Sequence, residues 1–146
     1  MRNAESGGIE LECDRYGKRW LYCEGDPELL FTENETNNER LFASQNRTAF
    51  VKDGIGEYVV HGNTGAVNPA KTGTKAAANY KLTLPAHSEV VVRLRFVDKE
   101  ISRKDAKTQS PFEDFDDAFA QRIAEADEQA LYDSFVQYQR ERFWDL

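Results

Sequence analysis

The sequence predicts a mainly β protein with a C-terminal helix, in which an antiparallel β-sandwich is followed by a linker helix. Short segments in the first three quarters of the chain alternate apolar and polar residues, which is the two-residue period of a half-buried strand. Turn-forming residues separate several of these segments at hairpin length, which favours antiparallel pairing. The last quarter instead places apolar residues three and four positions apart, the period of an amphipathic helix.

The strands are expected where apolar residues stand between turn signals. The first, Ile9 to Cys13, alternates strictly, and a turn-like segment, Asp14 to Lys18, separates it from the aromatic segment Arg19 to Cys23. Gly25-Asp26-Pro27 then breaks the chain. Further strands are expected at residues 29–32, 57–61, 76–84 and 89–97. Between residues 40 and 56 neither period is sustained, so an irregular segment is expected there.

Residues 89–97 form the clearest strand, because their apolar side chains alternate with polar ones. The residues of the apolar face are Val90, Val92, Leu94 and Phe96. We expect this face to be the inner face of the sheet. A hairpin turn at Pro85 to Ser88 is expected to join this strand to the one before it.

The chain divides into a β-sandwich portion at residues 1–98, a charged linker at 99–110 and a helical segment at 111–146. Pro111 suits the first turn of a helix, and the acidic residues that follow it suit the positive N-terminal end of the helix dipole. Phe115, Phe119 and Ile123 begin an apolar stripe on one helix face. We expect this stripe to be buried against the sheet.

The composition favours a folded protein and excludes several classes of partner. The 146 residues are 12% aromatic and carry a formal net charge of −7. This acidic balance argues against binding of duplex nucleic acid and against electrostatic binding to anionic membranes. No apolar run approaches the length of a membrane-spanning helix, and the first residues contain no apolar signal core. The sequence therefore predicts a soluble cytoplasmic protein.

The cysteines and histidines do not have the spacing of a metal site. Cys13, Cys23, His61 and His87 lack closely spaced ligand pairs. A hairpin could bring the two cysteines together, but without an export signal two buried thiols are expected rather than a disulfide. Thr72 to Lys75 resembles only the tail of a phosphate-binding loop. Neither a metal nor a cofactor is predicted.

The most suggestive polar segment directly follows residues 29–32. Its candidate residues are Glu33, Asn34, Glu35 and Asn37. Two carboxylates two positions apart in a strand have Cα atoms about 6.6 Å apart, close to the carboxyl separation in inverting glycosidases. They would face the same side, whereas a glycosidase acid and base approach the sugar from opposite faces, so no catalytic residue is predicted. The segment is either a solvated acidic turn or a loop whose amides contact a ligand such as a sugar.

Several blocks of sequence occur in an order typical of one family. The blocks are Trp20 to Gly25, Glu28 to Asn37, Glu39 to Phe42, Tyr58 to Gly62, Ala66 to Pro69, Thr72 to Ala78, Phe119 to Arg122 and Ala124 to Glu128. Together they resemble the bacterial glucosidase-like proteins of the glycoside hydrolase family 63 type. The resemblance extends roughly over residues 9 to 130.

The resemblance implies that the chain corresponds to the later part of an N-terminal β-sandwich, a partial super-sandwich, together with its connecting helix. In that family a C-terminal (α/α)6 barrel carries the general acid and base of an inverting α-glucosidase. No catalytic carboxylate is therefore carried onto this chain. The block that contains Glu33 and Asn37 is expected to contact the barrel or its substrate cleft.

The sequence thus predicts a non-catalytic β-sandwich segment of a family 63-like α-glucosidase, which takes part in carbohydrate metabolism by supporting the barrel and the entrance to the sugar site. The expected partners are the barrel, in the same protein or as a separate chain, and an oligosaccharide or small glycoside. Self-association is also expected, because strands without partners present open edges. Two alternatives stay open: a stand-alone carbohydrate-binding module, marked by an exposed aromatic platform, and a protein-interaction module.

Overall fold

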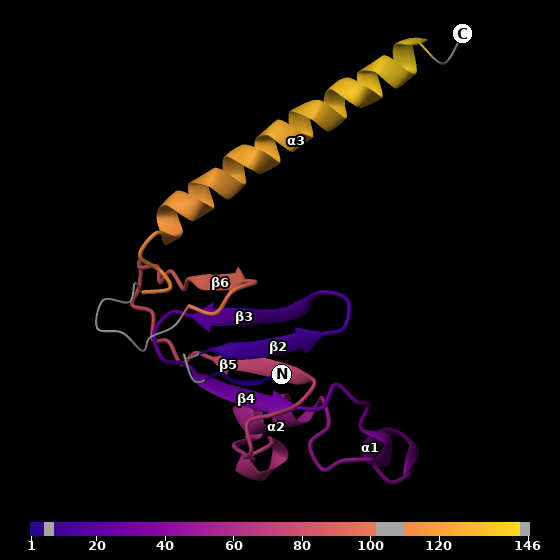
Figure 1. Cartoon of the computed structure of the whole chain (residues 1–146). Coiled ribbons are helices and arrows are strands. Elements are labelled where there is room, and N and C mark those ends of the chain that lie inside the picture. Colours follow the sequence, from indigo (N-terminus) through magenta and orange to yellow (C-terminus); the bar gives the residue numbers. More distant parts are fainter. Residues whose placement is uncertain (5–7, 102–109, 144–146) are drawn as a thin grey trace. The chain divides into compact units, whose positions relative to one another are not determined.

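A computed structural model of the chain describes residues 1–4, 8–101 and 110–143 (Figure 1). The chain forms two compact units, Met1–Gln109 and Ser110–Leu146, called unit 1 and unit 2 below. Unit 1 is built mainly from antiparallel strands in two sheets, and unit 2 contains one long helix. The predicted fold class, a β-rich portion followed by a C-terminal helix, is therefore confirmed.

The first sheet of unit 1 has four antiparallel strands in the order β1-β2-β3-β6. The strands are β1 (Arg2–Asn3), β2 (Ile9–Cys13), β3 (Gly17–Cys23) and β6 (Leu94–Val97). The turn predicted after Cys13 joins β2 to β3, and Ile9 pairs with Leu21 across this hairpin. Ile9 and Tyr22 are buried. The strand predicted from alternation at Ile9 to Cys13 matches β2, and the aromatic segment Arg19 to Cys23 lies within β3.

The second sheet consists of two antiparallel strands, β4 (Glu28–Thr32) and β5 (Lys75–Asn79). Leu30 pairs with Ala77 in the middle of the ladder. Among the described residues of unit 1, the buried apolar side chains are Ala4, Ile9, Tyr22, Leu30, Phe31, Val51 and Val67. Leu30 and Phe31 belong to β4. The buried set is small for a unit of this length, because many large apolar side chains remain exposed.

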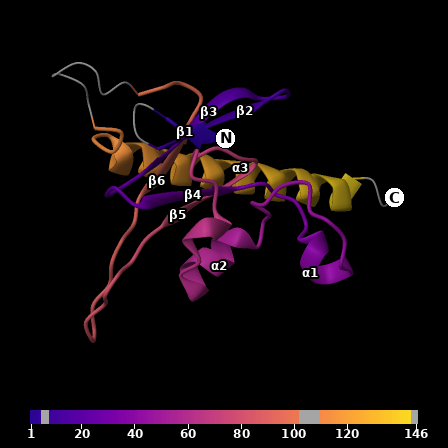
Figure 2. The same cartoon turned by 90° about the horizontal axis from the view of Figure 1, so that it is seen from below.

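Three short helices follow β4: α1 (Asn38–Phe42), α2 (Gly54–His61) and the 3-10 helix η1 (Thr64–Ala66) (Figure 2). The predicted strand at residues 57–61 is wrong, because this segment belongs to α2. Gly62, with a φ of 68°, ends the helix in the left-handed region that glycine adopts readily. Ile55 and Tyr58, one turn apart, are half-buried, whereas Val59 and Val60 are exposed. The burial therefore follows a helical spacing and not the alternation of a strand.

The two strands predicted on either side of Pro85 to Ser88 are much shorter than expected. Residues 76–84 contribute only to β5, and residues 89–97 only to β6. The segment between them, residues 80–93, is called the arm below; it turns at residues 86 and 87, as predicted, and projects from unit 1 (Figure 2). No described strand pairs with the arm, so its alternating pattern is not converted into a ladder.

The predicted inner face of that strand is also wrong. Val90, Val92, Leu94 and Phe96 are 47%, 36%, 51% and 60% exposed. β6 pairs with β3 on one side, but no other element described in unit 1 covers this face. An apolar face alone does not determine burial, because burial also needs a second layer to pack against it.

Unit 2 contains α3 (Phe115–Phe143), which confirms the predicted helix. Residues 111–114 form a turn before it, and Asp116 and Asp117 lie in its first turn. Within unit 2, Phe119 is 58% and Ile123 is 50% exposed, and packing of the stripe against the sheet of unit 1 stays a prediction. Phe115 is half-buried and stacks on Phe119, with ring centroids 5.9 Å apart. Most of the predicted linker lies outside the described residues.

Candidate functional site

The candidate polar segment begins where β4 ends, and main-chain hydrogen bonds fix its start. The Glu33 amide donates to the Phe50 carbonyl at 2.7 Å, and the Lys52 amide donates to the Glu35 carbonyl at 3.0 Å. Glu33 is thus outside β4, and the two carboxylates are not neighbours on one face of a strand as the sequence-based geometry assumed. The loop is held by the chain that precedes α2.

Glu33 and Asn34 are joined to the start of β5 through one side chain. The Thr74 hydroxyl donates to Glu33 Oε2 at 2.6 Å and accepts from the main-chain N–H of Asn34 at 2.8 Å. Gly73 allows this approach, because a β-carbon at that position would overlap the carbonyl oxygen of Thr32. A glycine is therefore needed next to the threonine.

Glu35 and Asn37 have different partners. Glu35 forms an ion pair with Arg47 at 3.4 Å. Asn37 is the N-cap of α1: its Oδ1 accepts from the Arg40 amide at 3.1 Å and from Asn46 Nδ2 at 3.1 Å. An N-cap asparagine satisfies amide groups that the first helical turn leaves unpaired. The side chains of Glu33, Glu35 and Asn37 are thus each engaged in holding the loop, and they do not converge on one site.

A polar cavity of about 450 Å³ lies beside this loop. Its polar lining includes Asn37, Arg40, Asn46, Asp53, Glu57 and Asn63. Arg40 and Asp53 form an ion pair at 3.3 Å across two elements. Of the four candidate residues only Asn37 reaches this cavity. Sequence reasoning missed the cavity because its residues come from α1, α2 and two loops that no local pattern connects.

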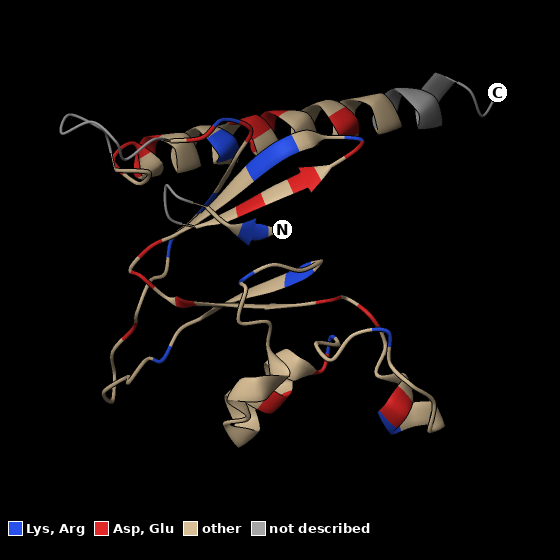
Figure 3. Cartoon of the chain, turned by 60° about the horizontal axis from the view of Figure 1, so that its bottom comes forward, with Lys and Arg blue, Asp and Glu red and all other residues tan. Residues whose placement is uncertain are grey.

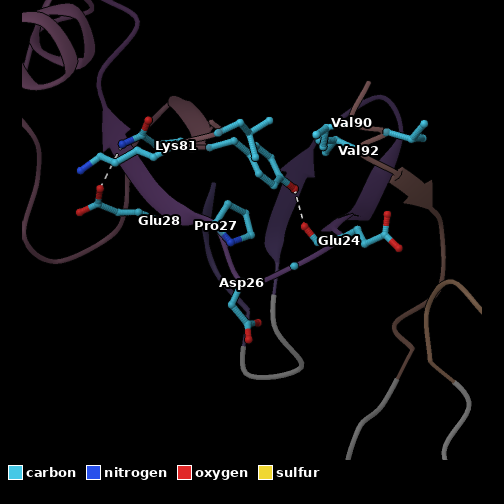
Figure 4. Close-up of a pocket in the computed structure, with 12 residues that line it drawn as sticks. Glu24, Asp26, Pro27, Glu28, Lys81, Val90 and Val92 are labelled. Atoms are coloured by element: carbon cyan, nitrogen blue, oxygen red, sulfur yellow. Dashed lines mark hydrogen bonds between the residues drawn. The ribbon is translucent and has the colours of Figure 1, made fainter. Parts of the chain in front are cut away.

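An apolar groove of about 500 Å³ lies between the arm and the chain that leads into β4 (Figure 4). Tyr80, Leu82, Val90 and Val92 line it from the arm, and Pro27 lines it from the other side. The Tyr80 hydroxyl donates to the Glu24 carbonyl at 2.8 Å and ties the base of the arm to the end of β3. The alternating apolar residues of the arm were the sequence signal for this groove, but they were interpreted as the buried face of a strand.

Glu28 links α2 to both strands of the second sheet. The Tyr58 hydroxyl donates to Glu28 Oε1, and Asn79 Nδ2 donates to Glu28 Oε2 at 3.1 Å. The hydrogen bond from Tyr58, followed by that from Asn79, lowers the pKa of the Glu28 carboxyl below its ordinary value. The same carboxylate raises the pKa of the Tyr58 phenol. The pair therefore ties α2 to the second sheet.

The two cysteines lie at opposite ends of the β2–β3 hairpin, Cys13 in β2 and Cys23 in β3. Cys13 pairs with Gly17 where β3 begins, whereas Cys23 is the last residue of β3. Both are free thiols, but Cys13 is exposed, so the prediction that both are buried is wrong for Cys13. Burial raises the pKa of the Cys23 thiol. In the part of the chain that the structure describes, no three potential metal-ligating side chains form a group that could hold an ion.

Comparison with known proteins finds similarity to a short part of a longer yeast protein. No known protein family and no solved structure matches the chain. The chain is similar to a Saccharomyces cerevisiae protein, "Uncharacterized protein YMR196W", with 47% identity over 73 residues. The match covers 49% of this chain, and the chain spans only 7% of the yeast protein. Among the described helices, none is long and apolar enough to cross a membrane.

Proposed function

We propose that the chain is a non-catalytic β-rich segment that supports the catalytic barrel of a larger protein similar to glycoside hydrolase family 63. The barrel would belong to the same protein or to a separate chain. The proposal rests on the exposure of the apolar side chains of the arm, in a unit that buries few apolar residues. Such a surface is typical of a segment that a neighbouring domain covers.

The arm has the features of a docking surface. Leu82, Leu84 and Val91 are 49%, 54% and 71% exposed, and Val90 and Val92 add to the apolar groove at its base. Contiguous exposed apolar surface usually marks an interaction site, since burying it removes apolar area from water. The resemblance described above favours a barrel domain as the cover.

The bonds around the candidate loop support a structural role. Glu33 is held by Thr74, Glu35 by Arg47, and Asn37 by α1. A general acid and base need access to opposite faces of a sugar, which these anchored side chains do not provide. In the proposed function the loop is a rigid support beside the sugar site and takes no part in bond cleavage.

A carbohydrate-binding module has less support. The large exposed aromatic side chains in the described part of unit 1 are Tyr16, Phe42 and Phe96. They lie on the β2–β3 turn, on α1 and on β6, so no two of them share an element as a stacking platform would favour. A protein-interaction role fits the arm without requiring a sugar.

The yeast relative allows a direct test. The region of the yeast protein that matches this chain is deleted, and the remaining yeast protein is expressed with and without this chain in affinity-tagged form. If the chain supports a neighbouring domain, the truncated protein co-purifies with it in equal amounts. Failure to recover a complex, whether the truncated protein is soluble or aggregated, contradicts the proposal.

Matched variants show which surface is responsible. Val91→Lys places a charge on the arm, where the side chain is 71% exposed, and should abolish co-purification. Val60→Lys places the same charge on α2, where the side chain is 72% exposed, and should leave it unchanged. Equal loss in both variants would mean that the arm is not the docking surface.

A further inference from the structure

The polar cavity beside the candidate loop is built from parts of the chain that are separated in sequence. Lining residues come from α1, from the segment that leads into α2, from α2 itself and from η1. Its volume of about 450 Å³ lies within the range of small-molecule sites. All of these residues belong to Met1–Gln109, so the cavity is formed by unit 1 alone.

Hydrogen bonds between side chains and main chain hold the walls of this cavity. Asn46 Nδ2 donates to Asn37 Oδ1 at 3.1 Å, and Asn46 Oδ1 accepts from the main-chain N–H of Asn38 at 2.7 Å. Asn63 Oδ1 accepts from the main-chain N–H of Gly65 at 3.2 Å and fixes the start of η1. Walls that are fixed before a ligand enters reduce the entropy that binding costs.

Hydrogen-bond donors remain available on these walls. The side-chain oxygens of Asn37 and Asn63 accept the bonds just described, but neither Nδ2 group has a partner among the described residues. Each of these nitrogens carries two hydrogens that it can donate. Arg40 adds further N–H groups, since its ion pair with Asp53 uses only the terminal nitrogen Nη1.

Two carboxylates supply acceptors. Asp53 is the N-cap residue of α2, and Glu57 follows it by one helical turn, so the two side chains lie near each other. Both line the cavity. Asp53 Oδ2 pairs with Arg40, whereas Asp53 Oδ1 and the half-buried Glu57 carboxylate have no partner in the described part of the chain. A partly desolvated carboxylate gains free energy when a donor replaces the water it has lost.

We infer that this cavity binds a neutral sugar of monosaccharide size. A hydroxyl group both donates and accepts, so neighbouring hydroxyls can use the amide N–H groups and the carboxylate oxygens together. An anionic ligand would be repelled by Glu57, and a ligand without donors would leave this carboxylate unpaired. The inference goes beyond the proposed function, because it needs no neighbouring barrel, and its failure would leave docking at the arm unaffected.

The cavity differs from the stacking platform of a carbohydrate-binding module. Among the described residues that line it, none is aromatic. A bound sugar is therefore held by hydrogen bonds that compete with water, and each such bond contributes little net free energy. Weak binding, detectable at millimolar sugar concentrations, is expected.

Nuclear magnetic resonance of the isotope-labelled full-length chain provides the test. The probes are glucose, mannose and galactose. At least one of them should give saturable shifts of the main-chain amide of Gly65 and of the side-chain amides of Asn37 and Asn63. Permethylated glucose, which accepts but cannot donate, and glucuronate, which is anionic, should bind severalfold more weakly. Absence of saturable shifts with all three sugars, or equal binding of either control compound, overturns the inference.

Matched variants locate the binding site. Glu57→Ala removes a carboxylate acceptor and should weaken binding about tenfold or more, as expected for a hydrogen bond to a charged group. Glu12→Ala removes the same group from an exposed position on β2, outside the cavity lining, and should have no effect. Equal binding by these two variants would show that the cavity is not the site.

A third variant tests the cavity without removing a hydrogen-bonding side chain. Ala49 lines the cavity, and Ala49→Leu should weaken binding severalfold because the larger side chain occupies part of the space. Thermal unfolding checks that each variant is folded. If Ala49→Leu binds the sugar as the unmodified chain does, or if a folded Glu57→Ala does so, the inference is wrong.

Discussion

Gly54, in the first turn of α2, lies directly against the main-chain carbonyl of Ala66 in η1, where a β-carbon on Gly54 would overlap the oxygen. Gly54 is also buried and close to the side chain of Thr32, at the end of β4. The absence of a side chain therefore lets α2, η1 and the end of β4 meet at one point. This close approach helps to fix the chain that follows the candidate loop.

Replacing Gly54 should destabilise unit 1. Gly54→Ala should lower the free energy of unfolding by about 1–3 kcal/mol, because the methyl group must displace a main-chain carbonyl. The matched control is Gly56→Ala in the same helix, where a β-carbon meets nothing within 4 Å. Alanine loses less conformational freedom on folding than glycine does, so Gly56→Ala should be more stable than the unmodified chain by about 0.5–1 kcal/mol. Denaturant unfolding measures both, and equal stability of the two variants would contradict the packing.

The hydrogen bond between Tyr58 and Glu28 should make stability depend on pH in the acid range. The pKa of Glu28 is lowered in the folded state, chiefly by this bond. Its contribution is therefore present above the ordinary carboxyl pKa and is lost as the pH falls through the lowered value. Tyr58→Phe should destabilise unit 1 near neutral pH and approach the unmodified chain in acid.

Thermal unfolding of the chain and of Tyr58→Phe across the acid range tests this pH dependence. Tyr16→Phe is the matched control, because it removes a hydroxyl from an exposed ring for which the structure describes no hydrogen bond. The control should behave as the unmodified chain at every pH. A constant difference between Tyr58→Phe and the unmodified chain would show that the bond does not shift the titration.

The two units should respond very differently to loss of a phenylalanine. Phe31 is completely buried in β4, so Phe31→Ala should cost about 3–5 kcal/mol of stability. Phe119 is 58% exposed on α3, and Phe119→Ala should change the stability by no more than about 0.5 kcal/mol. Calorimetry of both variants checks the contrast. A large loss for Phe119→Ala would mean that the helix face is covered in solution.

Self-association is expected to proceed through unit 1. Its arm exposes apolar side chains and its formal net charge is zero, so the repulsion between copies comes from unit 2, and salt screens that repulsion. Light scattering at micromolar concentration should show dimers or larger assemblies. Val91→Lys should shift the population toward the monomer, and Val60→Lys should not. A monodisperse monomer that binds no hydrophobic dye would contradict the expectation.

The purified chain should not hydrolyse α-glucosides. Glu33 and Glu35 have separate structural partners, Thr74 and Arg47, and no opposed acid and base are formed. A chromogenic α-glucoside, with a competent α-glucosidase assayed alongside, provides the measurement. Turnover that disappears in Glu33→Gln or Glu35→Gln would contradict a purely supporting role.

Elements with a clear local pattern were predictable. The β2–β3 hairpin, β4 and α3 each combine a period with a turn or an N-terminal signal that the sequence displays. α2 was mistaken for a strand because Tyr58, Val59 and Val60 favour strands, and because Gly54 and Gly56 disfavour helices. The segment is nevertheless helical, and the close approach of Gly54 to the carbonyl oxygen of Ala66 leaves no room for a side chain at this position.

The candidate loop was located from the sequence, but its bonds were not. Glu33 accepts a hydrogen bond from Thr74, which lies 41 residues further along the chain, and no local pattern predicts such a contact. Asn37 is different, because an asparagine followed by a short helix-compatible segment is a recognisable N-cap. The exposed stripe of α3 shows a further limit: its period predicts a helix, but only the surroundings determine whether the stripe is covered.

The formal net charge of the chain is carried by unit 2, because Met1–Gln109 contains sixteen acidic and sixteen basic residues whereas Ser110–Leu146 contains ten acidic and three basic residues (Figure 3). Charge far from zero keeps protein molecules dispersed, and here all of the excess is carried by the 37-residue C-terminal unit. Salt screens exposed charges at distances beyond about 8 Å at physiological ionic strength. Added salt would therefore weaken the repulsion that unit 2 supplies and favour contact between the apolar arms of two molecules.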